Sequence, residues 1–138
     1  MTIEEIKKEI IEEFSAFDQW LDKYEYLIEL GRSMPMIDES AKCDDNLISG
    51  CQSRVWLDCK YSDNVLKFSA DSDAIITKGI ISLLIRVFDN QSPKDILSAD
   101  LDFLDEIGLK DNLTPTRANG LLSMIKQIKA YALVYSEK

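Results

Sequence analysis

The chain has 138 residues, of which 46% are hydrophobic and 30% are charged. This length supports one ordinary hydrophobic core, so we expect a single domain over residues 1–138. The formal net charge of -9 excludes a typical nucleic-acid-binding protein, because phosphate recognition requires a clustered Lys and Arg surface. A protein with a basic patch is the expected kind of partner.

The sequence contains no histidine. Ser-His-Asp and Cys-His catalysis are therefore excluded in their usual forms, as are zinc sites with histidine ligands. No window has the roughly 18 consecutive apolar residues of a membrane span, and the charged residues 1–8 lack the apolar region of a secretory signal. We therefore expect a cytoplasmic protein without membrane association, whose cysteines remain thiols.

Two amphipathic helices are predicted first. Apolar residues recur at three- and four-residue steps over residues 3–14, which is typical of a helix with one buried face. The second helix is predicted over about residues 18–30, with Leu21 on its buried stripe and Gly31 as a left-handed stop. Residues 32–49 lack periodicity, and so long an irregular connection favours a functional role.

A small antiparallel sheet is predicted next. β-type residues fill 53–61 and 65–70, residues 62–64 form the hairpin loop between them, and residues 46–48 are a candidate for a third, short strand. A sheet of two or three strands requires helices on one face. The predicted fold class is therefore α+β, with this sheet packed against several helices.

A strongly apolar helix is predicted over residues 74–88. Asp71, Ser72 and Asp73 precede it and are suited to capping its first turn. Gly79 lies within it and costs about 1 kcal/mol relative to alanine. We expect that glycine only where another segment packs closely.

The remaining helices are marked by their start and stop residues. Short helices are predicted over residues 94–97 and 101–107, the second ending at Gly108. Thr114 and Pro115 start the last helix, because the threonine caps and the proline fits the first helical position. This helix is expected to bury Leu121, Leu122, Met124, Ile125, Ile128 and Leu133, and to expose Lys126 and Lys129.

Three cysteines are present, with seven residues between Cys43 and Cys51 and seven between Cys51 and Cys59. Structural zinc sites use close cysteine pairs and four ligands, so these thiols fit a metal site poorly. Cys59, in the middle of a predicted strand, is interpreted as a small core residue. Cys43 lies in a polar loop without an activating neighbour, which leaves Cys51 as the candidate for chemistry.

Cys51 follows Gly50 and precedes a predicted strand. Gly50 can adopt the positive φ that a turn requires, and the backbone N–H groups of that turn, with Arg54 nearby, would favour a thiolate. The alternative is an inert thiol at the start of a strand. Residue chemistry alone does not choose between them, because a thiol pKa cannot be read from sequence.

Six sequence blocks cover nearly the whole chain: residues 22–31, 50–57, 71–74, Lys78-Gly79, 113–117 and Gly120-Leu121. Together, and in this order, they resemble the SufE family of sulfur-acceptor proteins in iron-sulfur cluster assembly. Arg54 is a difference, because the family commonly has glutamine there, and we expect its charge to lower the pKa of Cys51 or to alter docking.

The resemblance implies a fold similar to the iron-sulfur scaffold fold and the role of an accessory protein rather than an enzyme. Cys51 would accept sulfur from the persulfide of a SufS-like, pyridoxal-phosphate-dependent cysteine desulfurase, stimulate that enzyme, and pass the sulfur to a downstream cluster-assembly scaffold, with no cofactor in this chain. Gly50, Gln52, Asp73 and Arg117 correspond to partner-facing positions. Gln52 is expected to shape the loop, and Asp73 is equally suited to capping a helix.

Two other functions stay open at this stage. One is a scaffold that builds a cluster on its own residues, which would require several converging ligands. The other is an adaptor whose Cys51 is structural. For a sulfur carrier we expect a mobile loop that shields Cys51 over an apolar pocket, and a fully exposed Cys51 would contradict that expectation.

Overall fold

Six α-helices, three short 3₁₀ helices and two β-strands make up residues 1–35 and 37–137, the part of the chain that the computed structural model describes. The α+β fold class is confirmed. In chain order the elements are α1 (Ile3–Ser15), α2 (Trp20–Arg32), η1 (Glu39–Ala41), η2 (Asp44–Asn46), β1 (Val55–Ser62), β2 (Val65–Ser72), α3 (Ile75–Phe88), α4 (Pro93–Ser98), α5 (Phe103–Glu106), η3 (Lys110–Asn112) and α6 (Pro115–Ser136).

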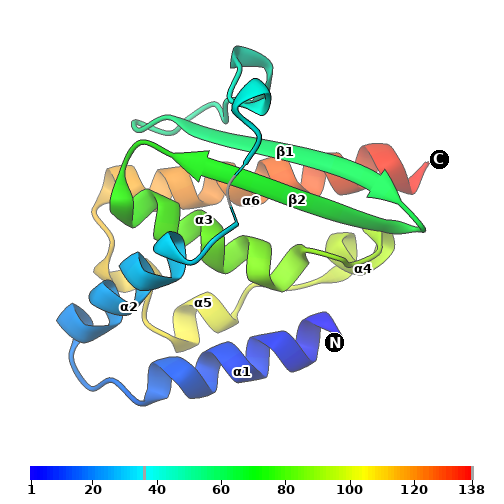
Figure 1. The fold of residues 1–138 in the computed structure, drawn as a ribbon. Coiled ribbons are helices and arrows are strands. Elements are labelled where there is room, and N and C mark those ends of the chain that lie inside the picture. The colour runs from blue at the N-terminus through cyan, green and yellow to red at the C-terminus, as the bar shows by residue number, and fades with distance from the viewer. Residues whose placement is uncertain (36, 138) are drawn as a thin grey trace.

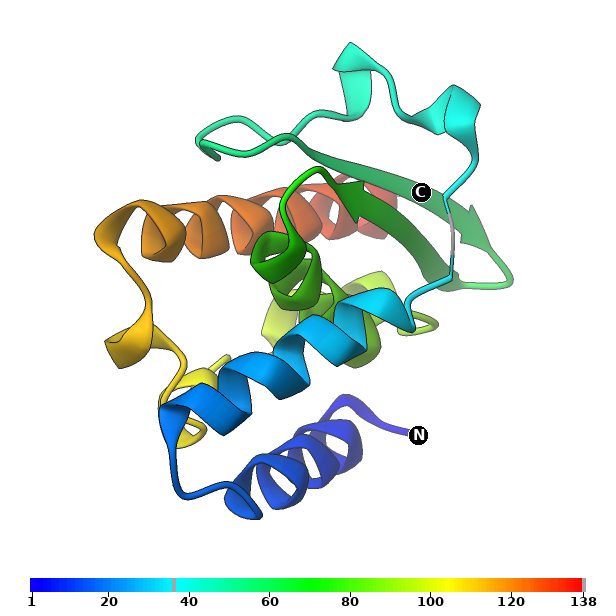
Figure 2. The ribbon, with the colours of Figure 1, turned by 60° about the vertical axis from the view of Figure 1, so that its left-hand side comes forward.

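The elements are arranged in layers (Figure 1). The sheet covers one side of α3 and α6, and α1 and α5 lie on the opposite side of these helices. In the turned view, α2 lies against α3, and the connection that follows α2 carries η1 and η2 to the outer side of the sheet (Figure 2). Lys42 holds this connection in place, because its ammonium lies 5.3 Å from the Trp56 ring centroid and 3.0 Å from an Asp71 carboxylate oxygen.

β1 and β2 pair in antiparallel register, from Val55 opposite Ser72 to Ser62 opposite Val65. Asp63 and Asn64 join them with φ values of 53° and 66°. Both residue types tolerate this left-handed region, which a two-residue hairpin turn requires. The strands turn an apolar face toward the helices, as their alternation predicts. The buried residues of that face are Val55, Leu57, Cys59, Leu66, Phe68 and Ala70.

The predicted strand over residues 46–48 does not form. Leu47 makes a single bridge with Trp56, and the Ile48 N–H donates to the Val55 carbonyl at 2.9 Å. Asp44–Asn46 form a 3₁₀ turn immediately before, so the backbone is extended for too few residues to continue the ladder.

Gly31 does not end α2, so that prediction was wrong. A Cβ at Gly31 would lie 2.8 Å from the Gly79 nitrogen, and one at Gly79 would lie 2.3 Å from the Leu27 carbonyl oxygen. The backbones of α2 and α3 therefore touch, which requires glycine on both helices. The expectation that Gly79 marks close packing is confirmed. Ser82 reinforces the contact by donating to the Leu30 carbonyl at 3.0 Å.

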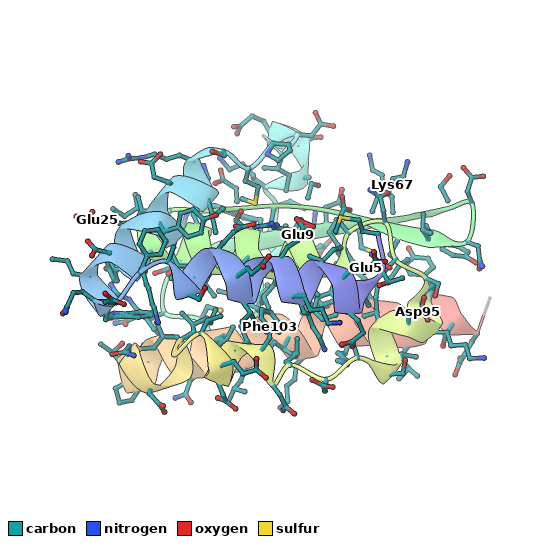
Figure 3. The ribbon with its side chains drawn as sticks, turned by 90° about the horizontal axis from the view of Figure 1, so that it is seen from below. Glu5, Glu9, Glu25, Lys67, Asp95 and Phe103 are labelled. Carbon is teal, nitrogen blue, oxygen red and sulfur yellow. The ribbon has the colours of Figure 1, made fainter. Side chains whose placement is uncertain are left out.

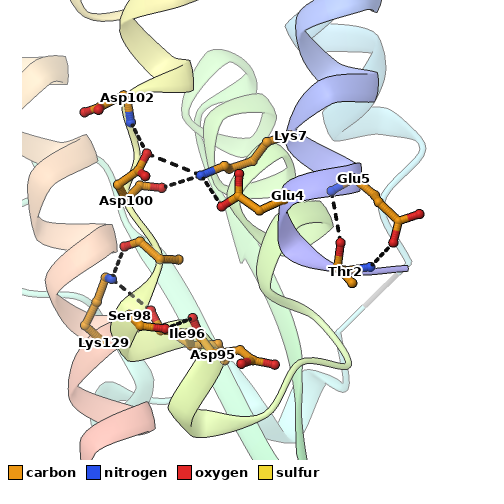
Figure 4. A network of polar contacts seen from close by, with 11 residues as sticks. Thr2, Glu4, Glu5, Lys7, Asp95, Ile96, Ser98, Asp100, Asp102 and Lys129 are labelled. Carbon is orange, nitrogen blue, oxygen red and sulfur yellow. Dashed lines mark hydrogen bonds and ion pairs between the residues drawn. The ribbon is translucent and has the colours of Figure 1, made fainter.

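Two lysines tie the helices beneath the sheet together (Figure 4). Lys7, only 5% exposed, contacts Glu4 at 3.0 Å and Asp100 at 3.3 Å. Lys129 does not face water as predicted, because its ammonium donates to three carbonyl oxygens at the end of α4, that of Ala99 at 2.6 Å. Burial lowers the pKa of Lys129.

Three leucines predicted to be buried are exposed instead: Leu21 by 68%, Leu122 by 52% and Leu133 by 55%. Apolar residues occur around much of α6, so the sequence pattern does not show which of them are buried. The packing of α6 against α3, α4 and the sheet decides which residues are buried. The α6 residues that are buried are Gly120, Leu121, Met124, Ile128 and Ala132.

The buried side chains of the helices and strands form one hydrophobic cluster. Viewed from below, Glu25, Lys67 and Asp95 lie at the periphery, whereas Phe103, which is 2% exposed, belongs to the cluster (Figure 3). Within residues 1–35 and 37–137, no helix combines the length and apolar character needed to cross a membrane. A single domain remains the prediction from chain length.

Candidate functional site

The loop that carries Cys51 depends on Gly50. Its φ is +87°, as predicted, a conformation that costs other residues energy. A Cβ at Gly50 would also lie 2.5 Å from the Ser123 hydroxyl oxygen on α6. The loop therefore lies against α6 in a backbone conformation that favours glycine.

Cys51 borders a pocket of about 370 Å³ between its loop, the start of α3 and the first half of α6. The expectation of an apolar pocket is met in part, because the apolar side chains of Ala74, Ile80 and Met124 share its walls with hydroxyl, amide and guanidinium groups. The lining residues are Cys51, Gln52 and Ser53 from the loop, Ala74, Thr77 and Ile80 from the α3 side, and Thr114, Thr116, Arg117, Gly120 and Met124 from the α6 side.

The Cys51 thiol is half-buried and donates to the Gly120 carbonyl oxygen, with 3.6 Å between sulfur and oxygen. Gly120 has no side chain, and a Cβ there would lie 3.6 Å from the same sulfur. Burial raises the pKa of Cys51, because a desolvated thiolate is unfavourable. The expectation that Arg54 lowers this pKa was wrong, since burial is the cause of the shift and its direction is upward.

Asp73 holds the base of the loop. Its carboxylate accepts the Arg54 N–H at 3.0 Å, and its own N–H donates to the Arg54 carbonyl at 3.2 Å. It does not cap α3, whose N-cap residue is Ala74, and no side chain caps that helix. Asp73 therefore extends the strand pairing by one step toward Cys51.

Arg117 lies at the pocket, in the first turn of α6. Its backbone N–H donates to the Thr114 hydroxyl at 3.3 Å, which confirms the predicted cap. Its guanidinium lies 5.9 Å from the centre of the Tyr24 ring on α2, within the range of a cation–π contact. The structure thus places Gly50, Gln52 and Arg117 around Cys51, with Asp73 behind the loop.

Thr77 and Tyr24 were not predicted at the site. Thr77 falls three residues after Ala74, so helical spacing would have placed both on one face of α3. Nothing in the sequence indicates that this face meets Cys51. Tyr24 lies within the predicted second helix, and its contact with Arg117 depends on how α2 and α6 pack.

The other two thiols are unlike Cys51. Cys43 is exposed, whereas Cys59 is buried in β1. Burial, with the charges of Asp58 and Asp89, raises the pKa of Cys59 to about 12. All three cysteines are free. Among the described residues, no three Cys, Asp or Glu side chains are grouped as ligands for a metal ion.

Comparisons with known proteins give a consistent result. The SufE family model, described as an Fe-S metabolism associated domain, matches residues 8–132. An uncharacterised SufE-like protein of Rhizobium meliloti is 38% identical over 129 residues, covering 90% of this chain and 92% of that protein. One from Rhizobium etli is 35% identical over 131 residues, covering 91% and 88%.

A solved structure has the same fold. The solution structure of a hypothetical protein from Thermus thermophilus matches with a TM-score of 0.79 over 96% of this chain and 97% of that chain. Its sequence identity is 18%, so this similarity concerns the fold alone.

Proposed function

This chain belongs to the SufE family, whose domain is associated with iron-sulfur metabolism, and on that premise we propose that Cys51 accepts sulfur from the persulfide of a cysteine desulfurase. The position of Cys51 carries the proposal. It is the thiol that both sits on a glycine-dependent loop and borders a pocket. Cys59 is enclosed in the core, and Cys43 lies outside that pocket.

The transfer is a thiol exchange. The Cys51 thiolate attacks the outer sulfur of the donor persulfide, and a new S–S bond forms at Cys51 Sγ. The donor's S–S bond breaks, its electron pair stays on the donor cysteine, and that thiolate takes up the proton that Cys51 lost. No oxidant or reductant is consumed. Neither a histidine nor a cofactor in this chain is required.

The raised pKa of Cys51 sets the order of events. A buried thiol is mostly protonated at neutral pH and attacks slowly, because the thiolate is the nucleophile. Attack therefore follows docking, when the loop brings Cys51 out of its partly buried position. This restrains transfer to molecules other than the partner.

The partner surface surrounds the pocket. Gln52 is exposed on the loop and Arg117 borders the pocket from α6, so both can contact the desulfurase. Gly50 and Asp73 act through the loop, which they shape and anchor. After loading, the protein releases sulfur to a downstream cluster-assembly scaffold. The cytoplasm is the proposed location, because it keeps Cys51 a free thiol.

Desulfurase turnover of cysteine, with and without this protein, tests the proposal. We expect the wild type to raise turnover and Cys51→Ser to remove the increase completely. Cys43→Ser is the matched control, since it removes an exposed thiol outside the pocket, and it should stimulate like the wild type. Stimulation by Cys51→Ser equal to that of the wild type would refute the sulfur-acceptor function and favour an adaptor.

A further inference from the structure

A threonine in the pocket has no hydrogen-bond partner. Thr77, the third residue of α3, lines the pocket beside Cys51 and is only 8% exposed. Its hydroxyl makes no hydrogen bond within the described part of the chain. No buried side-chain nitrogen or oxygen of the described residues lacks a partner, so the Thr77 oxygen is reached by solvent although most of the residue is covered. Because Thr77 lines the pocket, its unpaired hydroxyl is available to a group that enters there.

The surroundings of this hydroxyl favour a negative charge. The starts of the two longest helices, α3 and α6, both reach the pocket, through Ala74 and Thr116. Helix N-termini carry partial positive charge and unpaired N–H groups. Thr114 caps α6, but no side chain caps α3. The first turn of α3, to which Thr77 belongs, thus keeps its donors free.

The charged side chains at the pocket also favour a negative charge. Arg117 lines it, and no Asp or Glu does among the lining residues described, although the chain contains 25 acidic residues. An anion placed here meets a guanidinium, hydroxyl groups and helix N-termini, and the nearby Asp73 carboxylate accepts the Arg54 N–H behind the loop and does not line the pocket.

Cys51 borders the pocket, so a group attached to its sulfur would extend into the pocket. Its sulfur contacts Gly120, where the missing side chain leaves room within the 370 Å³ pocket. One further sulfur would extend Cys51 by an S–S bond of roughly 2 Å. The outer sulfur of a persulfide ionises more readily than a thiol, so it brings the negative charge that the pocket favours.

We propose that the pocket is an anion site for the outer sulfur of a Cys51 persulfide, and that Thr77 donates a hydrogen bond to this sulfur. The proposal rests on the sulfur-acceptor function and adds a residue that touches the transferred atom. The site retains the sulfur between loading and delivery, because a hydrogen-bonded, partly enclosed sulfur anion is a poorer target for solution nucleophiles.

Thr77→Val and Thr77→Ser form a matched pair for the test. Valine keeps the shape of threonine without the hydroxyl, and serine keeps the hydroxyl. Cys51 is loaded with inorganic polysulfide, whose terminal sulfur the thiolate takes while the shortened polysulfide leaves. The rate at which cyanide then removes the outer sulfur is measured. Unfolding midpoints of all three proteins are compared to confirm that they are folded.

We expect Thr77→Val to lose its sulfur about tenfold faster than the wild type, since a hydrogen bond to a charged group stabilises by about 1.5 kcal/mol or more. Thr77→Ser should stay within about twofold of the wild type. Equal rates for Thr77→Val and wild type, or a serine variant as fast as the valine variant, would overturn the anion site.

The outcomes separate this inference from the function on which it rests, because polysulfide loading needs no desulfurase. If Thr77 protects a chemically loaded persulfide but the desulfurase is not stimulated, the anion site stands and the proposed donor is wrong. If stimulation depends on Cys51 but Thr77→Val keeps sulfur as long as the wild type, the function stands and the anion site is wrong.

Discussion

The two sides of α3 differ in how completely they are packed. On one side, Gly79 meets Leu27 so closely that a Cβ would lie 2.3 Å from its carbonyl oxygen. On the other side, Thr77 and Ile80 face a pocket of about 370 Å³ shared with Cys51. The same helix is therefore interlocked with α2 and left open toward the candidate site.

The difference indicates how a chain of this size keeps open space beside the candidate thiol, Cys51. Well-packed interiors leave few voids larger than a water molecule, so an open pocket beside a core helix requires stabilisation elsewhere. The backbone contact between α2 and α3 supplies it, by fixing the wall that carries Thr77. The loop with Cys51 lies against α6 instead, and is free of that contact.

A side chain added at the contact between α2 and α3 should have the largest effect on stability. Gly79→Ala places a methyl group against backbone atoms that cannot move aside, so we expect the free energy of unfolding to fall by about 1 to 3 kcal/mol, despite the better helix propensity of alanine. Urea unfolding measures the change.

Gly120→Ala is the matched substitution on the open side. Its Cβ would lie 3.6 Å from the Cys51 sulfur, an ordinary contact. Helix propensity should leave stability unchanged or raise it by up to about 1 kcal/mol. Equal destabilisation by the two alanines would show that the α6 wall of the pocket is packed as tightly as the contact between α2 and α3.

The thiol on the open side should react slowly below its raised pKa. In a Cys43→Ser background, the rate of Cys51 alkylation should rise about tenfold per pH unit and continue to rise beyond 9.0, the ordinary thiol value. The sign follows from burial, which disfavours the thiolate and moves its formation to higher pH. A rate that levels off below pH 9.0 would indicate an activated thiolate in the free protein.

A smaller effect is expected from Tyr24, which links α2 to the pocket through Arg117. Tyr24→Leu removes the ring under the guanidinium, and a cation–π contact of about 0.5 to 1 kcal/mol corresponds to roughly two- to fivefold weaker binding of the desulfurase. Tyr24→Phe keeps the ring and should bind like the wild type. Titration calorimetry at fixed salt measures both, and equal affinities for the two variants would exclude a positioning role.

The sequence predicted the parts of the fold that depend on local signals. Thr114 caps α6, Gly108 has a positive φ of 79°, and the Asp63-Asn64 turn joins the strands, each for a reason contained in a few neighbouring residues. Gly31 was misread because glycine suits both a helix end and a close helix crossing. Only the position of α3 distinguishes the two.

In the candidate site, too, only the features determined by neighbouring residues could be predicted. Gly50 and Cys51 are adjacent, so their turn could be predicted. The polar lining of the pocket could not, because Thr77 and Arg117 come from helices whose mutual placement depends on the whole core. Asp73 fitted a helix cap by composition, but strand pairing with Arg54 uses its carboxylate instead.

Mapping the transferred sulfur tests the central claim most directly. The wild-type protein is incubated with a cysteine desulfurase and cysteine, alkylated, digested and analysed by mass spectrometry. The proposed function predicts one additional sulfur atom on the peptide that contains Cys51, and none on the peptides of Cys43 and Cys59. Sulfur on Cys43 with none on Cys51 would contradict it, as would a Cys51 peptide that stays unmodified while the desulfurase turns over.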